Sequence, residues 1–568
     1  MGVSQKPDTP YMLCISGFNA CRPMNKSRQQ RKTTRIPREK QIDMFGGAAA
    51  SPPPTPKPQK QSDSVPARVF VAPDPDDIYL GNTPLKTHLK EAGLKEPLVV
   101  RKLLQKQDWS TFEARYAPTG RPPYAPSAMM GLILYGVLQG VSSLRGLEKL
   151  ARRDLGCMWV SGGICPDHAI IGRFITLHDA SIQGEFFEQL TNSVLRVTGS
   201  NGDSLAGDGT VVEAACSHYD LLKAEAMRER AEQAQCEAQS TPEDTRKQQV
   251  AAQTEQALAN LQARAQARRQ KGKPHDHLRI SPQEPDAMIQ PLKRGRGVSP
   301  SYKPSVLANE VRVVLALDVH PSSENAVLQG MLEQSAAVTG HLPKELLLDA
   351  GYFNDHVIET ALDNDISLLC SEGREPGEPK HSDKCYPKSR FEYDEIQDCY
   401  HCPAGAKLIP ISQYQGKDSR PGYTLYGSDA CGNCDERNRC TRNRLGRRIK
   451  RYAGDTAKDA LRQVMQQPKA QRRLKKRKAM VESVFSTLRG NQGLNRFRRR
   501  GLSGVKTEFA LHVLAYNLSR ALAHALFYAF LATLIALQGL FGATRHRKPD
   551  LVAIREMPLT FFEQRAAA

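Results

Sequence analysis

The chain has 568 residues, of which 80 are Lys or Arg and 60 are Asp or Glu, giving a formal net charge of +20 at pH 7. Such a length allows about three or four domains of roughly 150 residues each, and so large a positive excess favours a polyanionic partner, nucleic acid first. Hydrophobic residues make up 40% of the chain and charged residues 25%, so the composition excludes a wholly disordered or fibrous protein.

Residues 1–74 are predicted to form a disordered, basic and proline-rich arm. This segment includes SPPPTPKPQK and has little apolar surface to bury. No basic stretch followed by an apolar run opens the chain, which predicts a cytoplasmic protein without a secretory signal. The 13 cysteines are then expected to be reduced, because their spread over a long chain does not resemble a disulfide framework.

Residues 75–200 are predicted to form a compact helical domain. Apolar residues recur at helical spacing over 127–139, 142–153, 166–177 and 184–198, and Ser142 and Asp167 are expected to cap the second and third of these helices. Basic side chains on two of the helices fit docking on DNA, although a solvated basic face explains them equally well. These side chains are Arg145, Lys149, Arg152, Arg153 and Arg173.

Alternating strand-like and helix-like segments predict an α/β core over residues 201–370 that resumes over 456–525. The strand-like segments are LAGDGTVVEA, VRVVLALDV, ELLLDAG and ISLLC, and the helix-like ones between them are NAVLQGMLEQ and NDHVIETALD. Two insertions interrupt this core. Residues 219–272, nearly all Ala, Glu, Gln, Lys and Arg, predict one long helix or a helical hairpin, and residues 371–455 are polar and rich in Cys.

Three carboxylates are candidates for a metal site. Asp208 and Asp349 each end an apolar, strand-like run, and ligand sites of open α/β sheets gather at strand ends. On the helix predicted over 470–490, Glu482 lies with Lys478 and Arg489 in a sector of about 40° at the edge of an apolar stripe. Taken singly, each Asp is equally a turn residue and Glu482 an ordinary ion-pair partner. Together they suit two Mg²⁺ ions in phosphoryl transfer, and residues 469–500 hold twelve Lys or Arg against one acid.

Six segments, in this order, carry a resemblance to a known family: YAPTGRPPYAPSAMM, LRGLEKLARRDLGCMWVSGG, PDHAIIGRF, GDGTVVEA, LLLDAGYFND and RKAMVESVFSTLRGNQGLNRFRRRGLSGVKTEFALHVLAYNLSR. They cover most of residues 75–525 and resemble bacterial insertion-sequence transposases of the DDE class. The resemblance implies an RNase H-like catalytic core, an InsH-like DNA-binding domain over 75–200, and an acidic triad of Asp208, Asp349 and Glu482 that binds two Mg²⁺ or Mn²⁺ ions.

The same resemblance implies a DNA transposase. Such an enzyme binds the terminal inverted repeats of its element in double-stranded DNA, hydrolyses a phosphodiester at each end and joins the new 3′-hydroxyl to target DNA, as a homodimer associated with the nucleoid. Lys475, Lys478 and Arg489 stand at the family's Tyr, Arg and Lys signature positions and are expected to contact DNA phosphates. Two alternatives stay open, a non-catalytic DNA-binding regulator derived from a transposase and an RNase H-like nuclease without strand transfer. The intact acids favour an enzyme, because carboxylates repel a phosphate backbone.

The Cys-rich insertion over 371–455 is predicted to resemble a zinc ribbon. Cys399 and Cys402 form one closely spaced pair and Cys431 and Cys434 another, which suits tetrahedral Zn²⁺. Cys385 or Cys440 could replace one ligand, and free thiols are the alternative. A closed site with four Cys ligands has no open position for water, so this zinc is expected to stabilise the insertion and not to catalyse.

The C-terminal tail over residues 526–568 has no predicted role. The apolar run over 521–543 is about long enough to span a bilayer, but it contains His524, Thr533 and Gln538, so a buried or partner-facing helix is predicted and no membrane contact. Three other acids near predicted strands fit the triad less well. They are Asp203, Glu213 and Asp318.

Overall fold

A computed structural model describes residues 68–292, 297–373, 386–417 and 421–541. The arm expected over 1–74 lies outside this range except for residues 68–74. Cys385 and the tail from residue 542 onward also lie outside it.

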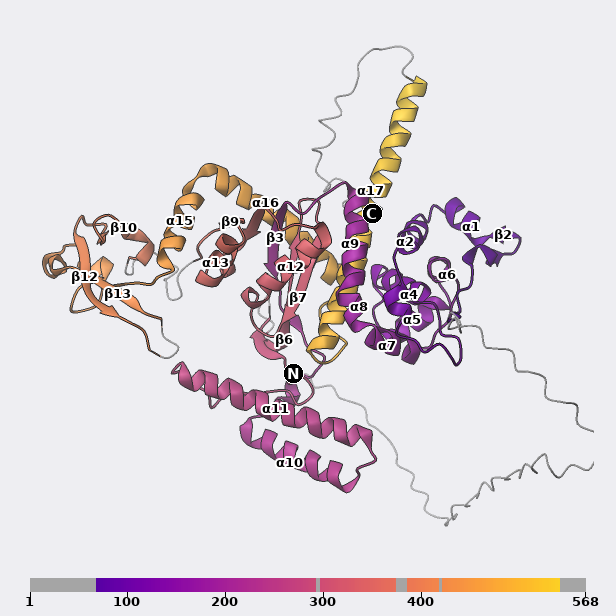
Figure 1. Ribbon diagram of the computed structural model, residues 1–568, viewed down its shortest axis with the longest axis horizontal. Coiled ribbons are helices and arrows are strands. Elements are labelled where there is room, and N and C mark those ends of the chain that lie inside the picture. The colour runs from indigo at the N-terminus through magenta and orange to yellow at the C-terminus, as the bar shows by residue number, and fades with distance from the viewer. Residues whose placement is uncertain (1–67, 293–296, 374–385, 418–420, 542–568) are drawn as a thin grey trace, which may run out of the picture. The chain divides into compact units, whose positions relative to one another are not determined.

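The N-terminal part of the described chain is helical, and at its centre lies α4, Pro126–Leu138 (Figure 1). Almost every residue of α4 is buried, because the segment PSAMMGLILYGVL is apolar around nearly the whole helix. The other helices of this part are α1, Leu85–Glu91; α2, Glu96–Leu104; α3, Ser110–Glu113; α5, Leu144–Ala151; α6, Leu155–Ser161; α7, His168–Leu177; α8, Asp179–Gln183; and α9, Glu185–Thr198. A two-stranded sheet of β1, Tyr79–Leu80, and β2, Thr83–Pro84, precedes them.

The four helices expected from apolar periodicity are present as α4, α5, α7 and α9. Asp167 caps α7 as expected, since its side chain accepts a hydrogen bond from the N–H of Ile170 at 2.7 Å. The expectation for Ser142 is wrong by one residue. Ser143 has the extended backbone of an N-cap and accepts from the N–H of Gly146 at 3.2 Å, whereas the hydroxyl of Ser142 accepts from Arg498.

A seven-stranded mixed sheet confirms the predicted α/β class. Its strands are β3, Ser204–Gly209; β4, Val212–Glu213; β5, Met288–Pro291; β6, Val298–Ala308; β7, Val314–His320; β8, Glu345–Leu348; and β9, Ser367–Cys370. Strands β3, β8 and β9 lie side by side and are parallel. The long strand β6 is antiparallel to its four partners, pairing with β4 and β5 in its first half and with β3 and β7 in its second.

Helices pack against the strands of this sheet. They are α12, Leu328–Thr339; α13, Asp355–Asp363; α15, Asp455–Gln466; α16, Pro468–Gly490; and α17, Leu502–Phe541. Helix α16 contacts β3, β6 and β8, while α17 contacts β7, α4 and α9. The buried Asn517 of α17 bonds both the N–H and the carbonyl of Val314, at 2.9 and 2.8 Å, and so satisfies backbone groups of β7. One core of buried apolar residues runs continuously from the helical part through the sheet.

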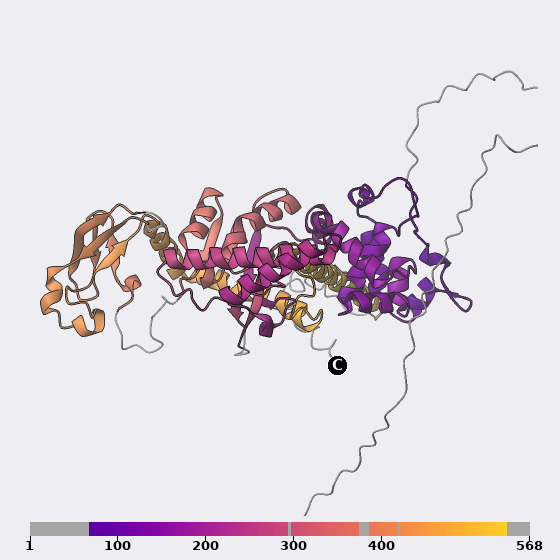
Figure 2. The same cartoon turned by 90° about the horizontal axis from the view of Figure 1, so that it is seen from below.

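The first insertion is a helical hairpin, one of the two forms expected. It consists of α10, Ala224–Ser240, and α11, Thr245–Gln270, which lie side by side in Figures 1 and 2. Its small apolar core is formed by Met227, Ala257, Leu261 and Ile280.

The second insertion forms a separate five-stranded antiparallel sheet, in which each strand pairs with the next along the chain. The strands are β10, Glu392–Asp394; β11, Cys399–His401; β12, Lys407–Tyr414; β13, Tyr423–Gly427; and β14, Ile449–Arg451, with the short helix α14, Arg437–Cys440, before β14. Five buried side chains make up its core: Phe391, Tyr400, Leu408, Tyr426 and Ile449.

The long C-terminal helix α17 is buried at its start. Within the described ranges, no helix is both long enough and apolar enough to cross a bilayer. The first turns of α17 instead pack into the core, with Phe509, Val513 and Leu518 fully buried.

Candidate active site

Two of the three predicted acids lie on neighbouring parallel strands. Asp208 is on β3, and Asp349 directly follows β8, with Ala206 of β3 opposite Leu347 of β8. Close packing between the strands requires Gly207, because a Cβ there would lie 2.4 Å from the side chain of Leu348. The parallel register therefore carries both acids to the same edge of the sheet.

One arginine connects these two carboxylates. Nη2 of Arg477, on α16, lies 3.7 Å from Oδ1 of Asp208 and 3.2 Å from Oδ2 of Asp349. The other oxygen of Asp349 accepts the backbone N–H of Gly351 at 2.9 Å, which orients the carboxylate toward Arg477. The side chains of Arg477 and Asp208 are only 13% and 17% exposed, so this is a partly desolvated charge cluster and not a surface ion pair.

Helix α16 runs alongside β3 in the same direction. Arg473, near its start, bonds Ser204 at the beginning of β3, Arg477 reaches Asp208, and further along Arg489 donates to the hydroxyl of Thr210 and the carbonyl of Val211. Arg473 also pairs with Glu345 at the start of β8, at 2.7 Å. These contacts hold the helix along the two strands that carry the acids.

Glu482 lies on α16 between the arginine that contacts Asp208 and the arginine that contacts Thr210. Its carboxylate pairs with Lys478 at 3.8 Å, and its side chain is 54% exposed. Glu482 and Arg489 are seven positions apart, about two helical turns, which places both on the same side of the helix at the edge of the buried stripe. Arg477 brings Asp208 and Asp349 together, whereas the donor atoms of the three acids do not all lie within 4.8 Å of one another among the described residues.

The predicted phosphate-contacting residues differ in their surroundings. Lys475 and Lys478 are exposed, whereas Arg489 is half-buried and already donates to the turn after β3. Of the less favoured acids, Asp203 pairs with Lys344 at 3.3 Å and Asp318 with Lys506 at 2.7 Å. Neither contacts Arg477 in any interaction of the described residues.

Sequence reasoning missed Arg477 and a fourth nearby carboxylate, Glu324. Glu324 follows β7 and is so close to β3 that a Cβ on Gly209 would lie 2.5 Å from its carboxyl carbon. It pairs with Lys303 of β6 at 3.2 Å. Burial raises the pKa of Tyr352, and the charges of Glu324, Asp349 and Asp208 add to the effect, so three carboxylates lie near this strand edge. The one sequence signal that could have identified Arg477 is its position as a charged residue on the buried side of α16.

Four cysteines of the second insertion line one cavity of about 30 Å³: Cys402, Cys431, Cys434 and Cys440. The N–H of Ala406 donates to the sulfur of Cys402 at 3.2 Å and so orients it. Burial raises the pKa of the Cys440 thiol, Arg447 lowers it, and the three other thiols of the cavity raise it further. The cavity thus gathers four thiols, the donor type of a structural zinc site, although no three of their sulfurs lie within 4.8 Å of one another among the described residues.

The predicted ligand Cys399 is not among the residues that line this cavity. Cys399 is the first residue of β11, whereas Cys402 follows the strand and its N–H donates to the carbonyl of Ala406 at 2.9 Å. Cys440, one of the replacements that the sequence left open, lines the cavity.

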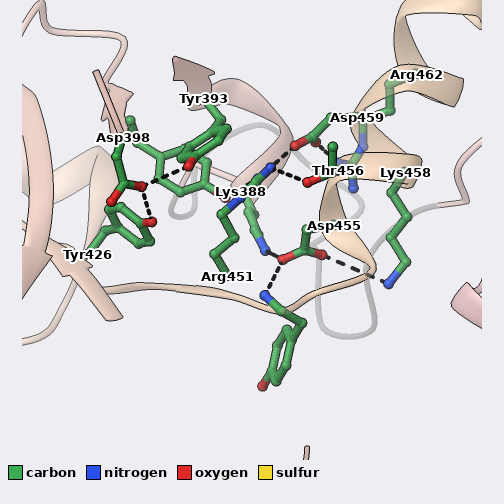
Figure 3. Close-up of polar contacts among 12 residues, drawn as sticks. Lys388, Tyr393, Asp398, Tyr426, Arg451, Asp455, Thr456, Lys458, Asp459 and Arg462 are labelled. Carbon is green, nitrogen blue, oxygen red and sulfur yellow. Dashed lines mark hydrogen bonds and ion pairs between the residues drawn. The ribbon is translucent and has the colours of Figure 1, made fainter. Parts of the chain in front are cut away.

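A polar network ties the second insertion to α15 (Figure 3). Arg451 of β14 donates to Asp459 at 2.8 Å, to Thr456 at 3.0 Å and to the hydroxyl of Tyr400 at 3.1 Å. Lys388 donates to Asp455 at 2.6 Å. Because α15 contacts α16, the insertion is anchored next to the helix that carries Arg477 and Glu482.

Two family models match the chain. One, described as a transposase DDE domain, matches residues 401–522, which include the second insertion from residue 401 onward, α15, α16 and the start of α17. The other, described as a transposase domain (DUF772), matches residues 90–177 in the helical part. No curated protein matches the sequence significantly.

Proposed function

Because the chain contains these two transposase domains one after the other, it is an insertion-sequence transposase of the DDE class. On that premise we propose a specific activity. The protein binds the terminal inverted repeats of its element, cleaves a phosphodiester at each end with two bound divalent ions, and transfers the 3′-hydroxyl to target DNA. Two ends must be held together for this reaction, so the active form is a homodimer on DNA in the nucleoid.

The observation that carries the proposal is the convergence of Asp208 and Asp349 on a single cation. Both carboxylates lie within 4 Å of one guanidinium nitrogen, at the end of two adjacent parallel strands. A pair of oxygen donors already arranged around a positive charge fits Mg²⁺ or Mn²⁺, which prefer carboxylate ligands. The strand edge is also partly exposed at Asp349, which gives an ion and a DNA phosphate access.

Each residue of the site has a role in this reaction. Asp208 and Asp349 hold the ions, and Glu482 is the third acid, presented from the exposed edge of α16. When bound, two divalent ions activate the attacking oxygen and stabilise the leaving oxygen of the phosphodiester. Lys475 and Lys478 are exposed near Glu482 and bind DNA phosphates, while Arg489 positions the turn after β3 through Thr210 and Val211.

The seven-stranded sheet with its helices is, by this proposal, the RNase H-like core. Two observations support this. Two acids lie on or directly after adjacent parallel strands, and the third lies on α16, which runs alongside β3. The helical part over 75–200 is the DNA-binding domain, with the exposed cations of α5 and α7 facing phosphates. Its matched transposase domain over 90–177 supports this assignment without distinguishing an InsH-like form.

We also propose a structural Zn²⁺ ion in the zinc-ribbon-like insertion over 371–455. The ligands are Cys402, Cys431, Cys434 and Cys440, supported by their common cavity of about 30 Å³. Four thiolates leave no coordination position open, so the ion holds the insertion together and takes no part in phosphoryl transfer.

A cleavage-and-joining assay tests the activity. Wild-type protein and Asp208→Asn are incubated with Mg²⁺ or Mn²⁺ and DNA that carries the gene's own flanking sequences. Asp363→Asn is a matched control, because Asp363 is an exposed acid of α13 away from β3. Joined products from the wild type and the control, but not from Asp208→Asn, are expected. Cleavage without joining would favour a nuclease, and binding without cleavage by any protein would favour a regulator.

A further inference from the structure

A second group of metal-binding side chains lies in the hairpin of β10 and β11. Asp394, Cys399 and His401 have donor atoms that all lie within 4.8 Å of one another, the one such group of three or more His, Cys, Asp or Glu found in the described ranges. The antiparallel register sets Asp394 directly opposite Cys399. Cys399 and His401 are two residues apart on β11 and therefore share a face of the strand.

The distances within this group are already close to those between ligands of one ion. Nε2 of His401 lies 3.6 Å from Oδ2 of Asp394 and 3.9 Å from the sulfur of Cys399. Ligand atoms at about 2.0–2.3 Å from Zn²⁺ in tetrahedral geometry are separated by roughly 3.3–3.8 Å. Only a small contraction would be needed to seat an ion between the three.

Surrounding hydrogen bonds hold the ligands in place. Oδ1 of Asp394 accepts the N–H groups of Ile396 and Gln397, each at 3.0 Å, which directs Oδ2 toward His401. Such secondary contacts are typical of carboxylates and imidazoles that bind metal ions.

The backbone next to Cys399 is fixed as well. Asp398 has a φ of 45°, a conformation uncommon for a residue other than Gly, and its carboxylate accepts the hydroxyls of Tyr393 and Tyr426 (Figure 3). This clamp closes the hairpin and sets the start of β11. Cys399 is 2% exposed, whereas the side chains of Asp394 and His401 are 25% and 40% exposed, so the group has a buried sulfur and a side open to solvent.

We propose that Asp394, Cys399 and His401 bind a second zinc ion, distinct from the ion of the four-cysteine cavity. Oxygen, sulfur and nitrogen donors together suit Zn²⁺ or another borderline transition metal, and exclude Mg²⁺ as the preferred ion. Three protein ligands leave the fourth position to water. The ion fastens the β10–β11 hairpin, and its binding does not depend on the proposed transposase activity.

Metal content of the purified full-length chain tests the site. Wild type and variants are loaded with Zn²⁺, freed of excess metal, and measured for zinc per chain by elemental analysis. The wild type is expected to hold two ions. His401→Ala, Asp394→Asn and Cys399→Ser are each expected to hold one, and Cys434→Ser is expected to lose the other. His356→Ala and Cys236→Ser are controls, since both residues are exposed on helices outside the insertion.

Cobalt distinguishes the two ions. Substitution with Co²⁺ gives thiolate charge-transfer absorption that scales with the number of sulfur ligands, so His401→Ala should remove a weak component and leave the strong one. Circular dichroism identifies any variant that fails to fold, and the remaining two variants then decide. Zinc content unchanged from wild type in folded His401→Ala and Asp394→Asn would overturn the proposal and reduce the group to an Asp–His ion pair beside a thiol.

Discussion

The strand edge that carries Asp208 and Asp349 differs sharply from the cysteine cavity of the second insertion. The carboxylates stand on a sheet whose core is continuous with that of the helical part, and the charge of Arg477 already compensates them. The cysteines belong to a small sheet whose core consists of five buried side chains. Oxygen donors at the first site suit a catalytic ion, and sulfur donors at the second suit a structural one.

If both proposed sites bind metal ions, this contrast predicts that they need them for different reasons. A large apolar core keeps the strand edge folded without an ion, so the ion there contributes to reaction rate. A sheet with so few buried residues cannot bury enough surface to be stable alone, and a metal ion is one of the usual remedies. Removing each ion should therefore affect activity in one case and folding in the other.

The largest expected effect is on catalysis. Asp349→Asn should lower Mg²⁺-dependent cleavage by about 10³-fold or more, because a metal ion supplies several kcal/mol of transition-state stabilisation and each 1.4 kcal/mol is tenfold in rate. DNA binding, measured by gel shift, should be kept or strengthened, since a negative charge beside phosphate is removed. If Asp349→Asn instead lost DNA binding and thermal stability together with cleavage, Asp349 would have a folding role, and the strand edge would not differ from the cysteine cavity in this respect.

The next effect is on the folding of the insertion. Cys440→Ser should release zinc and cost about 3 kcal/mol or more of the roughly 10–16 kcal/mol that structural zinc provides in small domains. Limited proteolysis with mass spectrometry should then find new cuts within residues 386–455 while the seven-stranded sheet stays protected. Cys236→Ser is the matched control on α10. Protection unchanged in Cys440→Ser would remove Cys440 from the ligand set.

A smaller effect is expected at Arg477. Arg477→Gln leaves two partly buried carboxylates without their cation, which should destabilise the metal-free protein by about 1–3 kcal/mol. Mn²⁺ should bind the variant about fivefold more tightly than the wild type, since a competing pair worth about 1 kcal/mol is lost. Thermal denaturation with and without Mn²⁺ measures both, and Arg472→Gln, an exposed position of α16, is the control. Weaker Mn²⁺ binding by Arg477→Gln would mean that Arg477 supports the ion and does not replace it.

The smallest effect concerns the joint between the insertion and α15. Burial raises the pKa of Asp455, but hydrogen bonds from Lys388 and the N–H of Tyr452 bring it below the ordinary value of 3.8. A lowered carboxyl pKa stabilises the fold above pH 3.8, and this stability is lost as the pH falls through the lower value. Asp455→Asn should therefore cost about 1–2 kcal/mol at pH 7 and progressively less toward pH 3. Urea unfolding at several pH values measures this, with Asp435→Asn as control, and a pH-independent difference would refute it.

Much of the fold was predictable, and the failures have physical causes. Helices α4, α7 and α9 were found because apolar residues recur at helical spacing and are buried accordingly. The long strand β6 was missed because Pro300 and Pro304 interrupt its pattern, and proline cannot donate to a strand ladder. Both prolines are accommodated where β6 changes partners along its length.

The site was predictable to a lesser degree. Asp208 and Asp349 were identified from strand ends, and their proximity follows from parallel pairing of β3 with β8. Arg477 was not identified, since helical spacing alone directs attention to the exposed edge of α16 and not to a cation on its buried side. For the thiols, sequence spacing pairs Cys399 with Cys402, whereas only Cys402 of the two lines the cysteine cavity, so that part of the prediction stays open.

The most direct test of the central claim is the metal dependence of Asp349→Cys. A thiolate binds Mg²⁺ poorly and accepts the softer Mn²⁺ more readily. If Asp349 is a ligand of the catalytic ion, this variant should not cleave element-end DNA with Mg²⁺ and should regain measurable cleavage with Mn²⁺. Cleavage by Asp349→Cys at the wild-type rate with Mg²⁺ would contradict the account, because the carboxylate would then not hold the ion.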